Sequence, residues 1–331
     1  MSTPRVYVIH ENPEWFPPLA AAFEAEGVPV EEILLTEGQI DLASEPEPGV
    51  YWSRMSASSH TRGHEHSKEY TRALLGHLER AGRQVVGGSH VLELEVSKVA
   101  QHGLLQRAGF DVPRTTAVFG TTTLKQAARA FTDGQDVPFI TKHNQGGKGL
   151  GVRRFDSLAE FDAYVDSPEF EEPVDGITLL QEYLTAREPF ITRVEFVGGE
   201  FVYAVRVDTS AGSFELCPAD ACEVPQTQTI AGAVCEVPGT DAPSAFSVRT
   251  EVTADHPLVQ QLRTFLAEQR ITIAGVEFME TTDGRHVVYD INTNTNYNPA
   301  VEETAPASGP RSIARYLGAL LAEQYAAATT A

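Results

Sequence analysis

Residues 273–298 read IAGVEFMETTDGRHVVYDINTNTNYN, and two strand-like runs in this stretch flank the pair Asp283-Gly284. Asp-Gly is a favoured two-residue turn of a β-hairpin. The numbers of facing residues in such a hairpin have a constant sum, so Glu277 faces Asp290, and Asn292 follows on the same face. The opposite face is predicted to be core, and it carries Val276, Phe278, Tyr289 and Ile291.

The predicted hairpin sets the carboxylates of Glu277 and Asp290 about 5 Å apart at Cβ, which is destabilising unless a cation neutralises them. Magnesium prefers oxygen ligands and takes one or two carboxylates, and the amide oxygen of Asn292 adds an uncharged ligand. The alternative is an exposed face whose acids repel weakly in water. The amides that follow favour a binding site, and we expect Asn294 and Asn296 to contact a polar substrate.

A second hairpin is predicted to turn at Gly198-Gly199. Arg193 and Arg206 then share one face as diagonal neighbours, about 7 Å apart. Two cations on one face require anions, which are either Glu195 or an incoming phosphate or carboxylate. The other face is predicted to be buried, and it carries Thr192, Val194, Phe196, Phe201, Tyr203 and Val205.

A glycine-rich loop, His143 to Val152, follows a predicted strand at Val137 to Lys142. Its glycines let backbone amides approach a phosphate closely, because no Cβ intervenes. No Ser or Thr follows the single lysine, Lys148, so the loop is not a Walker A motif. A flexible hairpin tip is the alternative. The residues that would contact phosphate are Gly146, Gly147, Lys148 and Gly149.

The first ninety residues alternate between predicted strands and helices, which indicates a small α/β lobe with a parallel sheet. A polar loop, Trp52 to His64, follows one strand end, where open α/β sheets bind ligands. We expect Arg54 and Arg62 to bind a substrate carboxylate there. The hydroxyls of Ser56 and Ser58 are also expected to contact substrate. A metal site at the histidines of this region is the alternative, but their spacing is not diagnostic.

Composition excludes some classes of partner. The 331-residue chain has a formal net charge of −21, which argues against nucleic acid and anionic membranes as partners. We expect a cytoplasmic protein, since the sequence has neither a signal-peptide pattern nor about 18 consecutive apolar residues.

The order of these segments, from about Leu92 to Tyr325, resembles the ATP-grasp superfamily, and within it the RimK-like and glutathione-synthetase-like carboxylate–amine ligases. The resemblance implies an α/β chain of α+β lobes. Residues 1–91 would form a Rossmann-like lobe that precedes the ATP-grasp region. Residues 92–188 would form the lid with the glycine-rich loop, and residues 189–331 the core lobe with the metal site.

The resemblance also implies roles for individual residues. Glu95-Val-Ser-Lys98 and Phe139-Ile-Thr-Lys142 resemble the segments that carry the two nucleotide lysines, and Leu180 to Leu184 resembles the hinge that binds adenine. Glu188 is expected on the ribose, and Lys148 is expected to act in catalysis with Arg193 and Arg206. The implied nucleotide-binding residues are Lys98, Lys142, Gly146, Gly147, Lys148, Gly149, Gln181, Glu182, Tyr183, Leu184 and Glu188.

Ala274-Gly-Val-Glu277 and Asp290-Ile-Asn292 resemble the paired metal-binding segments, which implies ATP with two Mg²⁺ ions, or Mn²⁺ as an alternative. The implied reaction joins a small carboxylate to an amine, with amino acids as expected substrates and a homodimer as an expected assembly. A phosphotransferase and a catalytically silent nucleotide-binding module are the alternatives. The chain departs from the glutamate ligases of the family at Ser210 to Cys222, which has no basic residue, so glutamate is not implied as substrate.

Overall fold

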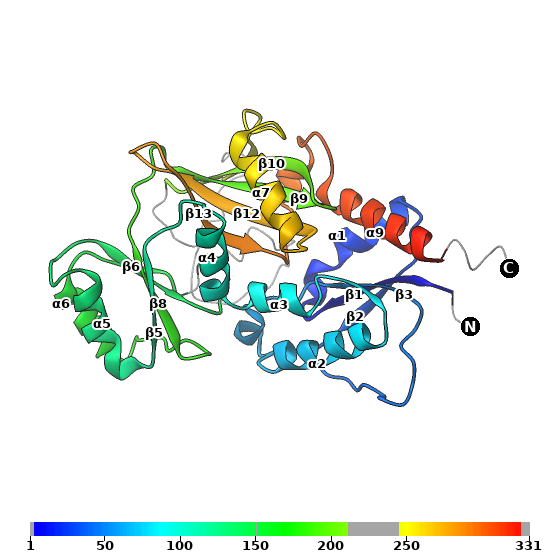
Figure 1. Cartoon of the computed structure of the whole chain (residues 1–331), viewed down its shortest axis with the longest axis horizontal. Helices are drawn as coiled ribbons and strands as arrows, with labels where there is room; N and C mark the ends of the chain where they lie inside the picture. Colours follow the sequence, from blue (N-terminus) through cyan, green and yellow to red (C-terminus); the bar gives the residue numbers. More distant parts are fainter. Residues whose placement is uncertain (1–2, 148, 150, 211–244, 326–331) are drawn as a thin grey trace, which may run out of the picture.

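The structure is a computed structural model that describes residues 3–147, 149, 151–210 and 245–325. Lys148 and most of the segment from Ser210 to Cys222 therefore lie outside the described residues. Three sheets form three lobes, with strand orders β2-β1-β3-β4, β5-β8-β6-β7 and β11-β10-β9-β12-β13 (Figure 1). No helix in the described ranges is long and apolar enough to cross a membrane.

The N-terminal lobe is a parallel sheet covered on both faces, as the alternating strands and helices predict. Side chains alternate along each strand, so Val8 and Trp52 pack on one face, while Ile9 and Tyr51 pack on the other. The elements of this lobe are β1 (Arg5–His10), α1 (Pro17–Ala25), β2 (Val30–Leu34), β3 (Gly49–Ser53), α2 (Ser67–Arg80) and β4 (Gln84–Val86).

The last helix of the chain, α9 (Gly309–Tyr325), packs against this first lobe. Its buried residues Ile313 and Leu317 join the cluster formed by Val8 and Trp52, and Figure 1 shows α9 beside α1. The predicted division placed α9 in the third lobe, so the packing differs from the predicted boundaries. The sheet has one face covered by α1 and α9 and the other by α2.

The lid lobe is smaller than predicted, because α4 packs against β13 of the core lobe instead of against the lid. Gln101 of α4 exchanges hydrogen bonds with the backbone of Ile291, and both are buried. The helices before the lid are α3 (Ser89–Glu95) and α4 (Lys98–Arg107). The lid elements are β5 (Thr115–Phe119), α5 (Leu124–Phe131), β6 (Phe139–His143), β7 (Arg153–Phe155), α6 (Leu158–Val165) and β8 (Ile177–Glu182).

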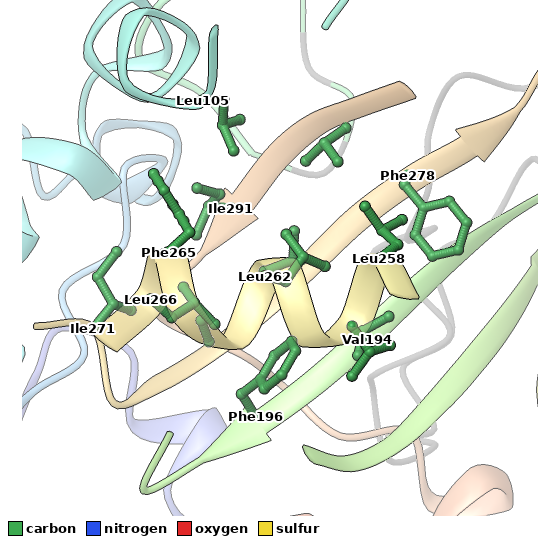
Figure 2. Close-up of a cluster of buried hydrophobic side chains, with 14 of the residues drawn as sticks. Leu105, Val194, Phe196, Leu258, Leu262, Phe265, Leu266, Ile271, Phe278 and Ile291 are labelled. Atoms are coloured by element: carbon green, nitrogen blue, oxygen red, sulfur yellow. The ribbon is translucent and has the colours of Figure 1, made fainter. Parts of the chain in front are cut away.

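The core lobe is an antiparallel sheet with α7 across one face. Figure 2 shows Leu258 of α7 beside Phe278 of the sheet and Phe265 of α7 beside Ile291. This apolar layer leaves the other face of the sheet available for the polar site. The elements are β9 (Phe190–Val197), β10 (Glu200–Asp208), β11 (Phe246–Val248), α7 (Pro257–Glu268), β12 (Ile273–Glu280), β13 (His286–Asn292) and α8 (Pro299–Glu302).

Candidate active site

The hairpin of β12 and β13 pairs Glu277 with Asp290, as the sequence predicts. The turn itself differs from the prediction. Hydrogen bonds between Thr281 and Arg285 close a three-residue loop, with Gly284 at a φ of 86°. This shifts the register by one residue near the turn, and an irregularity between Glu277 and Phe278 shifts it back.

The residue that this bulge adds to β13 is Tyr289, because Phe278 pairs with Val288 and Glu277 with Asp290. The prediction that Tyr289 lies in the core face is therefore wrong. Tyr289 lines a cleft together with Asp290 and Glu277. A one-residue insertion reverses the direction of the side chains on one side of it, which explains the difference.

The cleft between the lid sheet and the core sheet has a volume of about 240 Å³ and is lined by most of the predicted nucleotide residues. Apolar side chains from both lobes, including Ile140 and Met279, line it as well, and nothing in the sequence distinguishes them from core residues. The predicted residues that it brings together are Lys98, Lys142, Gly146, Gly147, Gly149, Gln181, Glu182, Tyr183, Leu184, Glu277 and Asp290. Its other lining residues are Pro113, Ile140, Val152, Ala186, Ile191, Thr209, Met279 and Tyr289.

Lys98, the first residue of α4, forms an ion pair with Asp290 of β13, with Nζ 2.6 Å from Oδ1. Burial opposes the charged forms of both groups, but their attraction outweighs it, raising the pKa of Lys98 and lowering that of Asp290. The facing carboxyl, Glu277, has its pKa raised by burial and by the charge of Asp290. The two acids are thus unequal, and Asp290 is the one held ionised.

Lys142 lies in the same cleft. Its side chain is 8% exposed, and no carboxylate of the described residues lies within ion-pair distance. Its Nζ lies 5.3 Å from the centre of the Tyr289 ring. Burial lowers the pKa of Lys142 to about 8, because the charged form is poorly solvated. A buried cation of this kind is stabilised by an incoming anion.

The carboxylate pair also fits a divalent cation whose coordination is completed by phosphates. No group of three or more His, Cys, Asp or Glu side chains in the described part of the chain could hold a metal ion on its own. Asn292 donates its amide N–H to Glu277 Oε1 at 3.3 Å, which leaves its amide oxygen as a further ligand. Mg²⁺ takes one or two carboxylates and leaves its other positions to water and substrate, so this donor set suits it.

Arg193 and Arg206 do not share a face, and that prediction is wrong. A register shift between Phe201 and Tyr203 pairs Arg193 with Val205 and Arg206 with Thr192. Arg206 therefore lies on the opposite face, where its guanidinium stacks 4.2 Å from the ring of Phe190. The shift also places Tyr203 and Val205 on the face of Arg193, apart from the other residues of the predicted buried face, Thr192, Val194 and Phe196.

Arg193 stays at the site and pairs with Glu195, with Nε 2.7 Å from Oε1. Its Nη1 lies 3.9 Å from Glu277. Burial raises the pKa of Glu195 to about 7, against the effect of the neighbouring Arg193. The sequence predicted two alternative anions for Arg193, which were Glu195 and an incoming substrate group. In this structure Glu195 forms the ion pair with Arg193.

A second, more polar chamber adjoins the cleft and has a volume of about 110 Å³. Glu277 and Asp290 line both spaces, so the carboxylate pair lies in their common wall. The chamber brings together the predicted residues Arg193, Ser56, Ser58, Asn292, Asn294 and Asn296, and its other lining residues include Trp15, Glu95 and Phe246. The N-terminal lobe therefore contributes one side of the chamber.

Besides Arg206, three of the described residues predicted for the site lie outside the linings of both spaces. Glu188 is exposed on the loop before β9. Arg62 forms a two-point ion pair with the buried carboxylate of Glu11, at 2.6 and 3.2 Å, so its charge is already neutralised. Arg54 is buried behind Asn296, to which it donates a hydrogen bond. Glu11 and Arg62 are 51 residues apart, so the local sequence pattern could not predict their contact.

The ring of Tyr289 is expected to hold Lys142 in place for the nucleotide. Replacing Tyr289 with leucine removes the cation–π contact and raises the KM for ATP by about threefold or more. The Tyr289→Phe variant keeps the ring and changes that KM by less than about twofold. Steady-state kinetics at varied ATP measure both. An unchanged KM for ATP in the leucine variant would contradict this role. An equal rise in KM in both variants would show that the hydroxyl of Tyr289, and not its ring, is responsible.

Comparison with solved structures agrees with this geometry, although no family model and no curated protein matches the sequence. A D-cycloserine synthetase matches 96% of this chain and 99% of its own, with 16% identity and a TM-score of 0.64. A RimK-domain ATP-grasp protein from Sphaerobacter thermophilus matches 94% and 98%, with 18% identity and a TM-score of 0.63. The ATP-grasp ligase PsnB, solved with a minimal precursor, Mg and ADP, matches 96% and 98%, with 15% identity and a TM-score of 0.62. The chain thus has the ATP-grasp fold, which confirms the fold predicted from its sequence.

Proposed function

We propose that this protein is an ATP-dependent ligase that joins a carboxylate to an amine through an acyl phosphate, acting on an amino acid or a small peptide. The carboxylate pair of Glu277 and Asp290 carries this proposal, because it lies in the wall common to the two spaces. One space holds Lys142, a buried cation suited to phosphates. The other is polar and holds Arg193. A phosphoryl group that moves from the nucleotide cleft to the chamber therefore passes beside Glu277 and Asp290.

The chemistry follows from this placement. An oxygen of the substrate carboxylate bonds to the γ-phosphorus of ATP, the bond from that phosphorus to the β-phosphate oxygen breaks, and ADP leaves. The amine nitrogen then bonds to the acyl carbon, the carbon–oxygen bond to phosphate breaks, and the amine loses a proton. Mg²⁺ held by Glu277, Asp290 and Asn292 would neutralise charge on the transferred group. Lys142 would hold the nucleotide phosphates, and Arg193 would orient the acid.

The solved structures that this chain resembles support the proposal by their described activities. They include a D-cycloserine synthetase, the ligase PsnB and a D-Ala:D-Ser ligase. Because this chain is only 13–16% identical to them, their substrates are not carried over to it, and the acid and the amine are inferred from the chamber alone. Its amide and hydroxyl groups suit a small polar acid.

Hydroxylamine tests the ligase against a phosphotransferase. Enzyme, ATP, Mg²⁺ and a panel of amino and dicarboxylic acids are expected to yield a hydroxamate with stoichiometric ADP, because hydroxylamine takes the place of the amine and attacks the waiting acyl phosphate. The ferric-chloride colour of the hydroxamate and the ADP released are both measured. Omitting the acid is the control. A stable phosphate ester without hydroxamate would refute the ligase and favour the phosphotransferase.

A further inference from the structure

The buried cations of the described residues differ in how they are satisfied. Four are buried, and three have a clear account: Arg249 pairs with acids, Lys68 donates to three neutral acceptors, and Lys142 faces the nucleotide cleft. Arg54, which is 2% exposed, is the fourth. Its Nη2 donates to the carbonyl oxygen of Thr295 and to Asn296, and its guanidinium carbon lies 5.6 Å from the centre of the Trp52 ring. Among the described residues, however, its Nε and Nη1 atoms have no hydrogen-bond partner, and no carboxylate lies within ion-pair distance of it. Buried charges are normally paired, so Arg54 requires an explanation.

The nearest acids are engaged elsewhere. Glu11 accepts from Arg62 and His64 with its two oxygens, and Oε2 of Glu95, which lines the chamber, accepts from the backbone and hydroxyl of Thr293. Their charges act on Arg54 only from a distance, and burial lowers the pKa of Arg54 to about 10. At neutral pH its guanidinium therefore remains charged, and no carboxylate in the described part of the chain neutralises it by direct contact.

Arg54 directly follows β3, at the end of the sheet where ligands are usually bound. The strand order β2-β1-β3-β4 reverses direction between β1 and β3, and ligands of open α/β sheets bind outside the carboxyl ends of the strands at this point. The chamber meets the N-terminal lobe here through Ser56 and Ser58, and Asn296, from the segment after β13, also lines it. Arg54 lies directly behind Asn296, with Nη2 2.9 Å from Oδ1.

The groups in front of Arg54 are left to donate hydrogen bonds. The amide oxygen of Asn296 accepts from Arg54, so its amide nitrogen is the group available to the chamber. Ser56 Oγ accepts from the backbone N–H of Ser58, and Ser58 Oγ accepts from Nη1 of Arg62. One hydroxyl proton joins the two serine oxygens, which lie 2.9 Å apart, and the other remains free. The wall therefore presents donors, with a positive charge behind them.

We propose that this wall, formed by Ser56, Ser58 and Asn296 with Arg54 behind it, is an oxyanion subsite that holds a second acidic group of the substrate. This assignment rests on the proposed ligase function for the identity of the ligand. The substrate class is an acid with two anionic groups, of which one is activated beside Arg193 and the other is anchored at the wall. The second group is a carboxylate or a phosphate, which share this chemistry. Arg54 acts through Asn296 and is a positioning residue.

Thermal unfolding in the presence of small anions tests the subsite without any catalytic turnover. The wild-type protein, saturated with Mg²⁺ and a non-hydrolysable ATP analogue to fill the nucleotide cleft, is titrated with formate, acetate or inorganic phosphate against chloride at equal ionic strength. We expect a saturable rise in Tm of about 2 to 4 °C at ten times the dissociation constant. Formate and acetate alone would identify a carboxylate subsite, and phosphate alone a phosphate subsite.

Variants then assign the effect to Arg54. Arg54→Met is expected to abolish the anion-dependent rise and Arg54→Lys to retain part of it, because lysine keeps the charge but not the geometry. Arg72→Met, which removes a half-buried arginine of α2 away from the chamber, is the matched control and should respond like the wild type. Absence of an anion-specific rise in the wild type overturns the subsite even if Arg54→Met does not fold. An equal rise in all variants overturns it too.

The outcome is separable from that of the ligase proposal. If anions bind at the wall but no acid gives a hydroxamate, the ligase proposal is wrong and the subsite is supported. If a hydroxamate forms but no anion raises the Tm, the subsite is wrong and the ligase proposal is supported. Among acids that give hydroxamate, those with a second acidic group should have a KM at least tenfold lower than their monoamides, and Arg54→Lys should narrow that ratio while changing kcat little.

Discussion

Replacing Asp290 with asparagine lowers kcat by about 10³-fold or more, which corresponds to roughly 4 kcal/mol of transition-state stabilisation. Asp290 is the acid of the facing pair that Lys98 and Lys142 hold ionised, and it lies in the wall that separates the nucleotide cleft from the chamber. Asparagine keeps the shape and removes the charge that a divalent cation would require. The measurement is ADP release at varied Mg²⁺, with the acid identified by the hydroxamate screen.

The matched control is Asp283→Asn, because Asp283 lies exposed in the turn of the same hairpin. We expect it to retain full activity. Sequence alone favours an unchanged or slightly higher stability for Asp290→Asn, since repulsion from Glu277 is relieved. The structure adds the ion pair with Lys98, so the free energy of unfolding should instead fall by roughly 1 to 3 kcal/mol. Full activity in Asp290→Asn would remove the metal assignment.

Replacing Lys142 with methionine weakens ATP binding by more than tenfold, or about 1.4 kcal/mol or more, without lowering the free energy of unfolding. Lys142 is a buried cation with no anionic partner among the described residues, so methionine fills the space at no cost in broken ion pairs. Calorimetric titration with ATP and chemical denaturation measure the two quantities. Lys125→Met on helix α5, where Lys125 pairs with Asp166 at the surface, is the control.

The pH dependence provides an independent check on Lys142. Burial lowers its pKa from 10.5 to about 8 in the folded protein, so between about pH 8 and 10.5 the unfolded state binds more protons than the folded state. The free energy of unfolding should therefore gain a contribution from this group as pH rises through that window, while ATP affinity falls. Lys142→Met should lack both trends. Unchanged ATP affinity in this variant would contradict the nucleotide placement.

The two hairpins show what a sequence can and cannot specify. A side-chain period of two means that any one-residue irregularity moves residues to the other face. In the β12–β13 hairpin, the longer turn and the bulge at Tyr289 cancel, so Glu277 still faces Asp290. In the β9–β10 hairpin, a single irregularity is not cancelled, so Arg206 leaves the site while Arg193 remains. No local pattern in either sequence indicates a bulge.

Local periodicity predicted the helices and strands, and the order of the motifs predicted the fold. Docking between distant elements was not predictable in the same way. Helix α4 packs against β13 and α9 against the N-terminal lobe, and each contact joins segments separated by about 190 residues or more. The pattern of an amphipathic helix indicates that its apolar face is buried, but not which surface it packs against. The predicted lobe boundaries therefore followed the chain, whereas the packing does not.

The position of α9 also has a consequence for synthesis of the chain on the ribosome. The first sheet is complete at Val86, but the helix that covers part of one of its faces begins at Gly309, about 220 residues later. At roughly 5 to 20 residues per second, about 10 to 45 seconds separate the two. Until α9 is made, Val8, Val50 and Trp52 lack the helix that covers part of their face of the sheet, so we expect the nascent N-terminal lobe to expose apolar surface.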